Sequence, residues 1–277
     1  MTHCPIIHII ITKYWARWCI YMNYVGIDIG STAAKTIVFN GEKVIASFVM
    51  PTGWSSKETA ARIKGQLESL GFNVASADIK TIATGYGRIS VEYADMVLTE
   101  ITCHGKGGYH LFSQDGVIID VGGQDTKVIT IKHGTVSNFL MNDKCSAGTG
   151  KFIEIMANRL AVNIDELFSL AEGGTPIPIS SMCTVFAESE IISHIGAGQP
   201  KTDLAAGIVQ SVVSRVALLV ERHDIKGICI LTGGLSHNQY FRKQLGKKLG
   251  REVHTHDLGK YAGALGAALI AADKFKH

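Results

Sequence analysis

The sequence predicts a two-lobed α/β protein with mixed sheets, because predicted strands and helices alternate along most of its 277 residues. One unit also occurs twice: a strand ending in Asp-x-Gly, a polar tip, a lysine and a second strand. Asp28 precedes Lys35 by seven residues, and Asp120 precedes Lys127 by the same number. A supersecondary unit repeated about ninety residues apart indicates a duplicated lobe. The chain is long enough for two lobes that each bury a core.

The composition is that of a globular protein and argues against some partners. Hydrophobic residues make up 46% of the chain and charged residues 18%, and the formal net charge is +3. Lys13 and Arg17 carry two of these charges, and no run of basic residues follows, so we expect no nucleic-acid partner. The apolar run over residues 6–11 is too short to span a bilayer and has no cleavage site, so we expect neither membrane association nor a signal peptide.

The cysteine pattern and the N-terminal segment bear on location and domain organisation. Six cysteines lie at positions 4, 19, 103, 145, 183 and 229, without the dense spacing of a disulfide framework, so a cytoplasmic protein is expected. Residues 1–21 resemble nothing that follows, and we expect an extension outside the fold, with a functional arm as the alternative. Residues 22–113 should form the first lobe, completed by a C-terminal helix over 261–275, and residues 114–260 the second.

In the first lobe the pattern predicts three strands, over residues 24–29, 36–39 and 44–49, with a turn at Asn40-Gly41 between the last two. An amphipathic helix over 57–70 ends before Gly71, and a short strand covers 81–84. A helix from Ile89, a strand near 96–100 and a glycine-broken helix from Cys103 complete this lobe.

In the second lobe the hairpin over 117–129 repeats the opening unit. Helices are expected over 152–160, near 164–171, from Met182 and over 203–223, followed by a buried strand over 228–231. The final helix over 261–274 is rich in glycine and alanine, which permits close packing. Hairpins among these elements indicate mixed rather than purely parallel sheets.

The two hairpin tips have the chemistry of a phosphate site. Glycine follows each aspartate by two residues, so backbone N–H groups at the tips can approach an anion closely. Two such tips, one per lobe, can hold a polyphosphate from both sides, while Asp28 and Asp120 hold a hydrated magnesium ion. A buried strand runs into Thr232-Gly233-Gly234. Because the two glycines have no side chains, their backbone can pass beneath a nucleobase or ribose.

The stretch from Met141 to Lys151 sets Cys145 directly before a glycine-rich helix start. Free N–H groups and the positive end of the helix dipole favour an anion there, and a nearby positive charge favours a thiolate. A helix-capping turn with an ordinary buried cysteine is the alternative for this stretch alone.

These motifs, in this order, resemble the actin, Hsp70 and sugar-kinase ATPase superfold, which is built from duplicated ribonuclease H-like domains. Within it the chain is similar to the activators of 2-hydroxyacyl-CoA dehydratases and the ATPase subunits of benzoyl-CoA reductase. The resemblance rests on five segments, over residues 26–35, 83–88, 120–125, 141–150 and 181–190, of which the last two carry Cys145 and Cys183.

The resemblance implies ATP or ADP with Mg²⁺ and a homodimer that shares one 4Fe-4S cluster. Cys145 and Cys183 of each chain would be the ligands, since such a cluster takes four thiolates. ATP hydrolysis would accompany delivery of a low-potential electron to a 2-hydroxyacyl-CoA dehydratase, or to a double-cubane or benzoyl-CoA-type reductase. A ferredoxin or flavodoxin would be the electron donor.

The resemblance also implies roles for single residues. Asp28 and Asp120 should hold magnesium through water, and Glu188 is a candidate for positioning the attacking water, with a surface carboxylate as the alternative. An adenine contact from Lys260 is not expected, because relatives often carry glutamine there. Phosphates are assigned to Gly30, Ser31, Thr32, Ala33, Ala34, Lys35, Gly122, Gly123, Gln124 and Asp125, and the adenosine side to Gly148, Gly150, Gly233 and Gly234.

Two other functions remain open at this stage. A small-molecule kinase of the same superfold would need a substrate pocket and a base, and the compact first lobe leaves little room for a pocket. A non-redox, ATP-gated adaptor would leave the cysteines as core residues, which is the expectation for Cys229. Cys103 and His104 suggest a metal site, but ordinary helix residues are the favoured interpretation.

Overall fold

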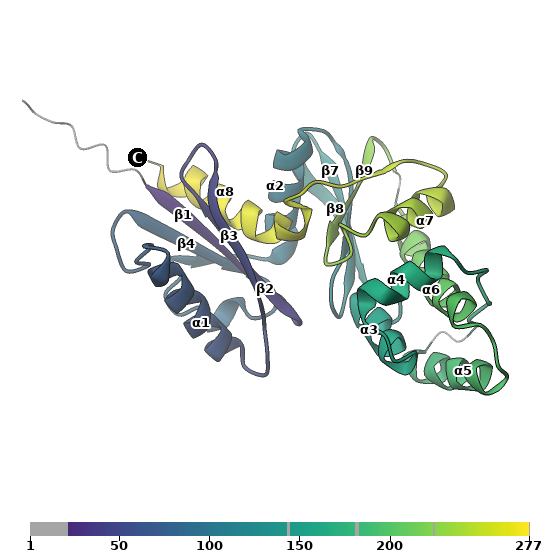
Figure 1. Ribbon diagram of the computed structural model, residues 1–277. Helices are drawn as coiled ribbons and strands as arrows, with labels where there is room; N and C mark the ends of the chain where they lie inside the picture. The colour runs from purple at the N-terminus through teal and green to yellow at the C-terminus, as the bar shows by residue number, and fades with distance from the viewer. Residues whose placement is uncertain (1–21, 143–144, 181–182, 224, 277) are drawn as a thin grey trace, which may run out of the picture.

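The computed structural model describes residues 22–142, 145–180, 183–223 and 225–276. The expectations for residues 1–21 and for a helix start at Met182 fall outside this part of the chain. The described residues form two lobes, each built on a five-stranded sheet, and Figure 1 shows the lobes side by side. The fold is therefore the mixed α/β architecture that the sequence predicts.

The two sheets have the same topology. The first sheet has the order β3-β2-β1-β4-β5, and the second has the order β10-β9-β6-β7-β8. Strands β1 to β5 of the first sheet therefore correspond to β6, β7, β8, β9 and β10 of the second. In each sheet the three strands that come first in the chain are paired antiparallel, and the two later strands are paired parallel on the other side of the first strand. The bounds are β1 Asn23–Ile29, β2 Ala33–Phe39, β3 Val44–Pro51, β4 Ile79–Thr84, β5 Met96–Val97, β6 Gly116–Val121, β7 Thr126–Lys132, β8 Thr135–Asn142, β9 Ile228–Gly233 and β10 Val253–His254.

Strand register extends the internal repeat beyond the segments visible in the sequence. Asp28 pairs with Lys35 between β1 and β2, and Asp120 pairs with Lys127 between β6 and β7. The third strands, β3 and β8, pair in the same way, since Lys35 pairs with Val49 and Lys127 pairs with Met141. The duplicated unit is thus a whole five-stranded sheet rather than a single hairpin.

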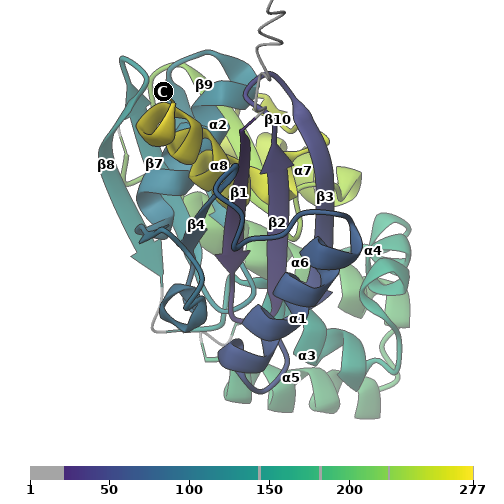
Figure 2. The same ribbon diagram turned by 90° about the vertical axis from the view of Figure 1, so that its left-hand side faces the viewer.

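Helices cover both faces of each sheet. In the first lobe α1 (Ser56–Ser69) packs Ile63 and Leu67 against one face of β1, and α8 (Ala262–Phe275) covers the other face. In the second lobe α2 (Glu100–Phe112) covers one face of the sheet (Figure 2). The opposite face is buried by α3 (Gly150–Arg159), α4 (Ile164–Glu172), α6 (Lys201–Val220) and α7 (Gln239–Leu249), with α5 (Thr184–Gly196) packed against α3.

The two lobes are joined by the helices α2 and α8. The chain leaves the first sheet through α2, which packs on the second sheet, and returns through α8, which packs on the first. The two helices lie against each other, and a side chain at Gly107 or Gly266 would overlap the backbone of the facing helix. We call this contact between the two connecting helices the α2–α8 seam.

Some local expectations were wrong. The helix expected from Ile89 is a single 3₁₀ turn over Arg88–Ser90, and the strand near 96–100 is only Met96–Val97. Helix α2 begins at Glu100, where the Thr99 side chain caps it, and it is not broken by its glycines. Gly107 lies at the contact with α8, whereas Gly105 and Gly108 lie against Val136 and Ile118 of the second sheet, so close packing on both sides of α2 explains these glycines. Strands β8 and β10 and helix α7 were not predicted.

Helix α6 is long and apolar enough to cross a membrane by length and composition. However, 61% of the relevant window is buried inside the protein. Its apolar residues pack in the core of the second lobe, beside Leu167, Phe168 and Phe241. Burial in the core therefore accounts for its composition.

Candidate functional site

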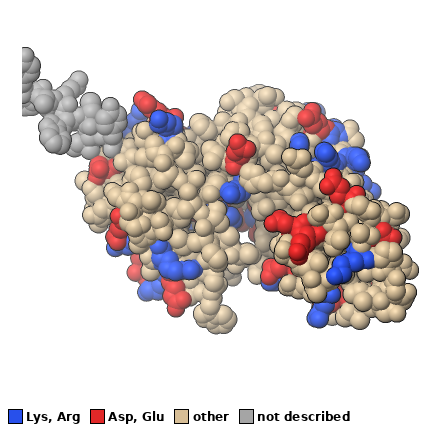
Figure 3. Space-filling model, viewed as in Figure 1, with Lys and Arg blue, Asp and Glu red and all other residues tan. Residues whose placement is uncertain are grey.

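A cavity of about 620 Å³ lies between the lobes where the two Asp-x-Gly hairpins meet. This volume is in the range of small-molecule sites, roughly 300–1,000 Å³. Figure 3 shows the hollow between the lobes on one face, with acidic and basic side chains scattered on either side of it. The lining includes Asp28, Gly30, Ser31, Thr32, Ala33, Lys35, Glu100, His104, Asp120, Gly122, Gly123, Gln124, Asp125, Lys127, Gly150, Lys151, Glu154, Gly233, Gly234 and Lys260.

The hairpin tips approach each other across this cavity. A turn closes each tip: Gly30 N–H donates to the Ala33 carbonyl at 3.2 Å, and Gly122 N–H to the Asp125 carbonyl at 2.9 Å. A side chain at Gly123 would overlap the hydroxyl of Thr32 in the other lobe. The second tip therefore needs glycine at this position to come so close to the first.

The start of α3 is attached to the second tip. Gly150 N–H donates to the Gly122 carbonyl at 2.9 Å, and Lys151 N–H donates to the Gly123 carbonyl at 2.8 Å. These two N–H groups are therefore used within the protein, whereas the sequence suggested that the helix start would offer free donors to an anion. Gly148 lies away from the cavity, where its carbonyl accepts from the Thr126 hydroxyl at 2.7 Å.

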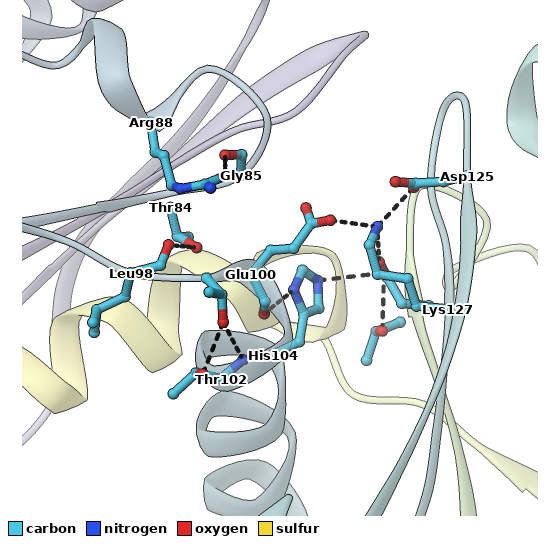
Figure 4. Close-up of polar contacts among 12 residues, drawn as sticks. Thr84, Gly85, Arg88, Leu98, Glu100, Thr102, His104, Asp125 and Lys127 are labelled. Carbon is cyan, nitrogen blue, oxygen red and sulfur yellow. Dashed lines mark hydrogen bonds and ion pairs between the residues drawn. The ribbon is translucent and has the colours of Figure 1, made fainter. Parts of the chain in front are cut away.

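Asp120, the last residue but one of strand β6, lies in a buried polar network with His104 and Lys127, which are both labelled in Figure 4. Its Oδ1 lies 3.4 Å from His104 Nε2 and accepts from the Thr232 hydroxyl at 3.1 Å, while Lys127 Nζ lies 3.6 Å from its Oδ2. Burial alone would raise the pKa of Asp120, but the His104, Lys127 and Lys35 cations hold it below its ordinary value. Asp120 is therefore a carboxylate.

His104 faces hydrogen-bond acceptors on both sides of its ring. Its Nδ1 lies 3.2 Å from the carbonyl oxygen of Glu100 (Figure 4), and its Nε2 lies 3.4 Å from Asp120 Oδ1. Since neither partner can donate, both ring nitrogens carry a proton. Burial opposes this charge, but Asp120 outweighs it and raises the pKa of His104 to about 9.

Lys127 is buried and contacts three carboxylates. Its Nζ lies 2.7 Å from Asp125 Oδ1, 3.3 Å from Glu100 Oε1 and 3.6 Å from Asp120 Oδ2. Burial would lower the pKa of Lys127, yet these carboxylates together raise it above its ordinary value. Burial raises the pKa of Glu100, and the neighbouring Lys127 partly offsets that effect.

Cys145 and Cys183 lie at one end of the neighbouring helices α3 and α5. Cys183 is the exposed N-cap of α5, and the half-buried Cys145 lies in the loop before α3. The hydroxyl groups of the next residues, Ser146 and Thr184, are hydrogen-bonded at 2.8 Å. Within the described residues no group of three or more His, Cys, Asp or Glu could hold a metal ion, so one chain offers this cysteine pair and no larger set.

The structure brings most of the predicted nucleotide residues together, with three exceptions. Asp28 and Asp120 line the cavity, as do Gly150, Gly233, Gly234 and the tip residues except Ala34, which is buried in β2. Gly148 lies outside the lining. Glu188 also lies outside it, because α5 packs on α3 and directs this carboxylate to an ion pair with Arg159.

Sequence reasoning missed Glu100 and His104 as cavity residues. The sequence pattern favours ordinary helix residues at Cys103 and His104, and it predicts that Glu100 lies in a strand. A predicted helix that begins at Glu100 would place Glu100 and His104 on one face, because they are four residues apart. Cys103 itself is buried away from the cavity, and burial raises the pKa of its thiol to about 12.

Comparison with known proteins gives strong matches over almost the whole described chain. The profile of a family described as the BadF/BadG/BcrA/BcrD ATPase family matches residues 25–271. The (R)-2-hydroxyglutaryl-CoA dehydratase activating ATPase of Acidaminococcus fermentans is 44% identical over 253 residues, 90% of this chain and 96% of that protein. The 2-hydroxyisocaproyl-CoA dehydratase activator of Clostridioides difficile is 39% identical over 259 residues, 92% of this chain and 97% of that protein.

Solved structures support the same relationship. Component A of the A. fermentans (R)-2-hydroxyglutaryl-CoA dehydratase superposes with a TM-score of 0.85 at 43% identity, covering 91% of this chain and 98% of that one. A ROK hexokinase from Thermus thermophilus superposes with a TM-score of 0.52 at 18% identity, covering 92% and 100%, which reflects the shared fold alone. The predicted actin-like, two-lobed ATPase fold is confirmed.

Proposed function

The chain belongs to the BadF/BadG/BcrA/BcrD ATPase family, and on that premise we propose that it is an ATP-hydrolysing activator of an acyl-CoA dehydratase or reductase. In this proposal it delivers one low-potential electron to a 2-hydroxyacyl-CoA dehydratase or to a double-cubane or benzoyl-CoA-type reductase. A cytoplasmic ferredoxin or flavodoxin supplies the electron. The range of partners is supported by relatives that are named as dehydratase activators and by one that is named as a component of a benzoyl-CoA reductase.

The hydrogen bond between Ser146 and Thr184 is the observation that carries the redox part of the proposal. It joins the residues that directly follow Cys145 and Cys183, so the two thiols of one chain lie in neighbouring segments. Both precede the N-terminal end of a helix, where the helix dipole favours negative charge. A generic ATPase needs no such arrangement.

The cysteine pair fits half of a 4Fe-4S site. Such a cluster takes four thiolates, so Cys145 and Cys183 of two chains would complete the set in a homodimer. When bound, the cluster would supply one-electron transfer. The first turn of α5 adds apolar surface beside Cys183, because Val185 and Phe186 are 66% and 67% exposed. A second copy of the chain at this position would cover these side chains.

The cleft residues fit a magnesium nucleotide. Backbone N–H groups at both hairpin tips and the ammonium group of Lys35 would bind phosphates. Asp28 and Asp120, at the ends of β1 and β6, would hold hydrated magnesium through water, since this ion keeps several of its waters in proteins. Magnesium would neutralise charge on the phosphate groups. The ion pair of Glu188 with Arg159 leaves this carboxylate outside the cleft, so we assign it no role in hydrolysis.

Anaerobic purification tests the proposal. We expect a brown dimer with about four iron atoms per two chains that hydrolyses ATP. Cys145→Ala and Cys183→Ala should each lose the iron and the visible absorption, whereas Cys229→Ala, a buried core position, should keep both. Iron assay, visible spectroscopy and light scattering give these readouts.

Three results would contradict the proposal. A colourless anaerobic protein that phosphorylates a sugar or a carboxylic acid would identify a small-molecule kinase. A colourless protein that binds ATP without phosphorylating such compounds would identify a non-redox adaptor. Loss of the cluster in Cys229→Ala but not in Cys183→Ala would place the iron elsewhere.

A further inference from the structure

Two side chains from the first turns of α2 reach into the nucleotide cavity and contact the second lobe. Glu100 and His104 lie one helical turn apart, and both line the cavity. Glu100 contacts Lys127 and His104 contacts Asp120, the lysine and aspartate of the second Asp-x-Gly hairpin. Figure 4 shows both side chains directed from α2 toward this hairpin.

Helix α2 is one half of the joint between the lobes. Its residues Ile101, Tyr109 and Phe112 pack on the second sheet, around Ile118 and Ile129. Its other side meets α8, which packs on the first sheet. A change in the angle between the lobes must therefore displace α2 relative to α8, and the glycine-lined seam permits such a shift.

The Glu100 contact leads directly to the phosphate-binding tip. Glu100 Oε1 lies 3.3 Å from Lys127 Nζ, which donates to Asp125 Oδ1 at 2.7 Å. The backbone carbonyl of Asp125 in turn accepts from Gly122 N–H, which closes the tip. A displacement of the tip by a bound phosphate is thus transmitted to the first residue of α2 through two polar contacts.

The His104 contact leads to the carboxylates of both lobes. Its ring faces Asp120 of the second lobe, and a side chain at Gly263 of α8 would lie 2.7 Å from His104 Cε1 and 2.6 Å from Asp28 Oδ2. Asp28 belongs to the first lobe. His104 therefore lies where α2, α8 and both hairpins meet, and it is only 6% exposed.

Within the part of the chain that the structure describes, the first lobe has no equivalent of this arrangement. Lys35 occupies the matching register position opposite Asp28, yet among the described residues no carboxylate forms an ion pair with it. The hairpin unit thus forms without helix-borne partners in one lobe. The contacts of Glu100 and His104 are therefore not part of the repeated hairpin unit. They form where α2 passes the second hairpin.

We propose that Glu100 and His104 are positioning residues that couple the phosphate-binding hairpin of the second lobe to the inter-lobe joint. When nucleotide occupies the cleft, the hairpin moves α2 through these two side chains, and the α2–α8 seam turns this movement into a change of lobe angle. The same tip also binds the start of α3, so the cysteine-bearing segment moves with it. This inference rests on the proposed nucleotide site.

The test compares His104→Leu, His104→Gln and Glu100→Gln with His110→Gln, a matched control at an exposed position of the same helix. Steady-state ATPase assays separate kcat from KM, and calorimetry gives the affinity for ADP. Hydrogen–deuterium exchange of the α8 peptide, with and without a non-hydrolysable ATP analogue, reports on the joint. Urea unfolding verifies that each variant is folded.

We expect the wild type and His110→Gln to show analogue-dependent protection in α8. His104→Leu should lose this protection and lower kcat by roughly 100-fold, the effect of a small misplacement of reacting groups. Its ADP affinity should change far less, because the backbone of the tips is intact. His104→Gln should recover part of both readouts, since its amide can donate to Asp120.

Unchanged kcat and unchanged protection in both His104→Leu and Glu100→Gln would overturn the inference. If His104→Leu does not fold, Glu100→Gln decides alone, because its side chain is less buried and its substitution conserves shape. The exchange experiment needs nucleotide binding but no turnover. A wild type that shows protection without hydrolysing ATP would thus reject the proposed function and leave the coupling standing.

Discussion

Ser146 and Thr184 are 38 residues apart in the chain, yet their hydroxyl oxygens lie 2.8 Å from each other. The bond holds the loop before α3 against the first turn of α5. Each residue directly follows one cysteine, so this contact holds the two cysteine-bearing segments together.

Loss of this hydrogen bond should loosen the proposed cluster site. For Ser146→Ala we expect a destabilisation of about 1 kcal/mol, confined to the cysteine-bearing segments, and faster removal of iron by a chelator under anaerobic conditions. Following the visible absorption over time measures this rate. Ser193→Ala, which removes a hydroxyl bonded only within α5, serves as the control. Equal rates for Ser146→Ala and the control would contradict the expectation.

A side chain at the second hairpin tip should interfere with closure of the cleft. Gly123→Ala would place a methyl group against Thr32 of the other lobe. Such overpacking costs about 1–3 kcal/mol, which corresponds to a loss of roughly 5- to 150-fold in nucleotide affinity. Titration calorimetry with ADP measures it. Gly196→Ala, where nothing lies within 4 Å, should bind as the wild type does.

The seam between α2 and α8 should tolerate no added side chain. Gly266→Ala would overlap the backbone carbonyl of Cys103, so we expect its free energy of unfolding to fall by at least about 1–3 kcal/mol. Urea denaturation of the apoprotein, with all variants at the same protein concentration, measures the change. Gly65→Ala in α1 meets nothing within 4 Å and should raise stability by up to about 1 kcal/mol. Similar midpoints for Gly266→Ala and the wild type would show that the seam is not tightly packed.

The cysteines should differ sharply in reactivity. Burial raises the pKa of the Cys103 thiol to about 12, and a raised pKa lowers the thiolate fraction at every pH below it. In iron-free native protein near pH 8, iodoacetamide should therefore modify the exposed Cys183 and leave Cys103 and the buried Cys229 unmodified. Mass spectrometry of peptides distinguishes the sites, and denaturant should make all of them reactive. Rapid modification of Cys103 in the native state would show that its burial is transient.

Several features of the site were accessible from sequence because they are local. The spacing of Asp28 from Lys35, and of Asp120 from Lys127, follows from a strand, a tight tip and a second strand, so it fixes the register of each hairpin. The motif resemblance then identified the family and the fold. The third strand of the second repeat was missed because β8 is an edge strand with an irregular pattern of exposed residues.

The sequence by itself thus determined the duplicated hairpins, their glycine-containing tips and the family, since short-range periodicity and turn residues encode them. Only the tertiary structure decided that His104 faces Asp120, that Glu188 turns to Arg159, and that the segments of Cys145 and Cys183 adjoin. These relationships join residues far apart in the chain. They depend on how whole helices pack against sheets and each other, which is set by the sum of many buried contacts rather than by any local pattern.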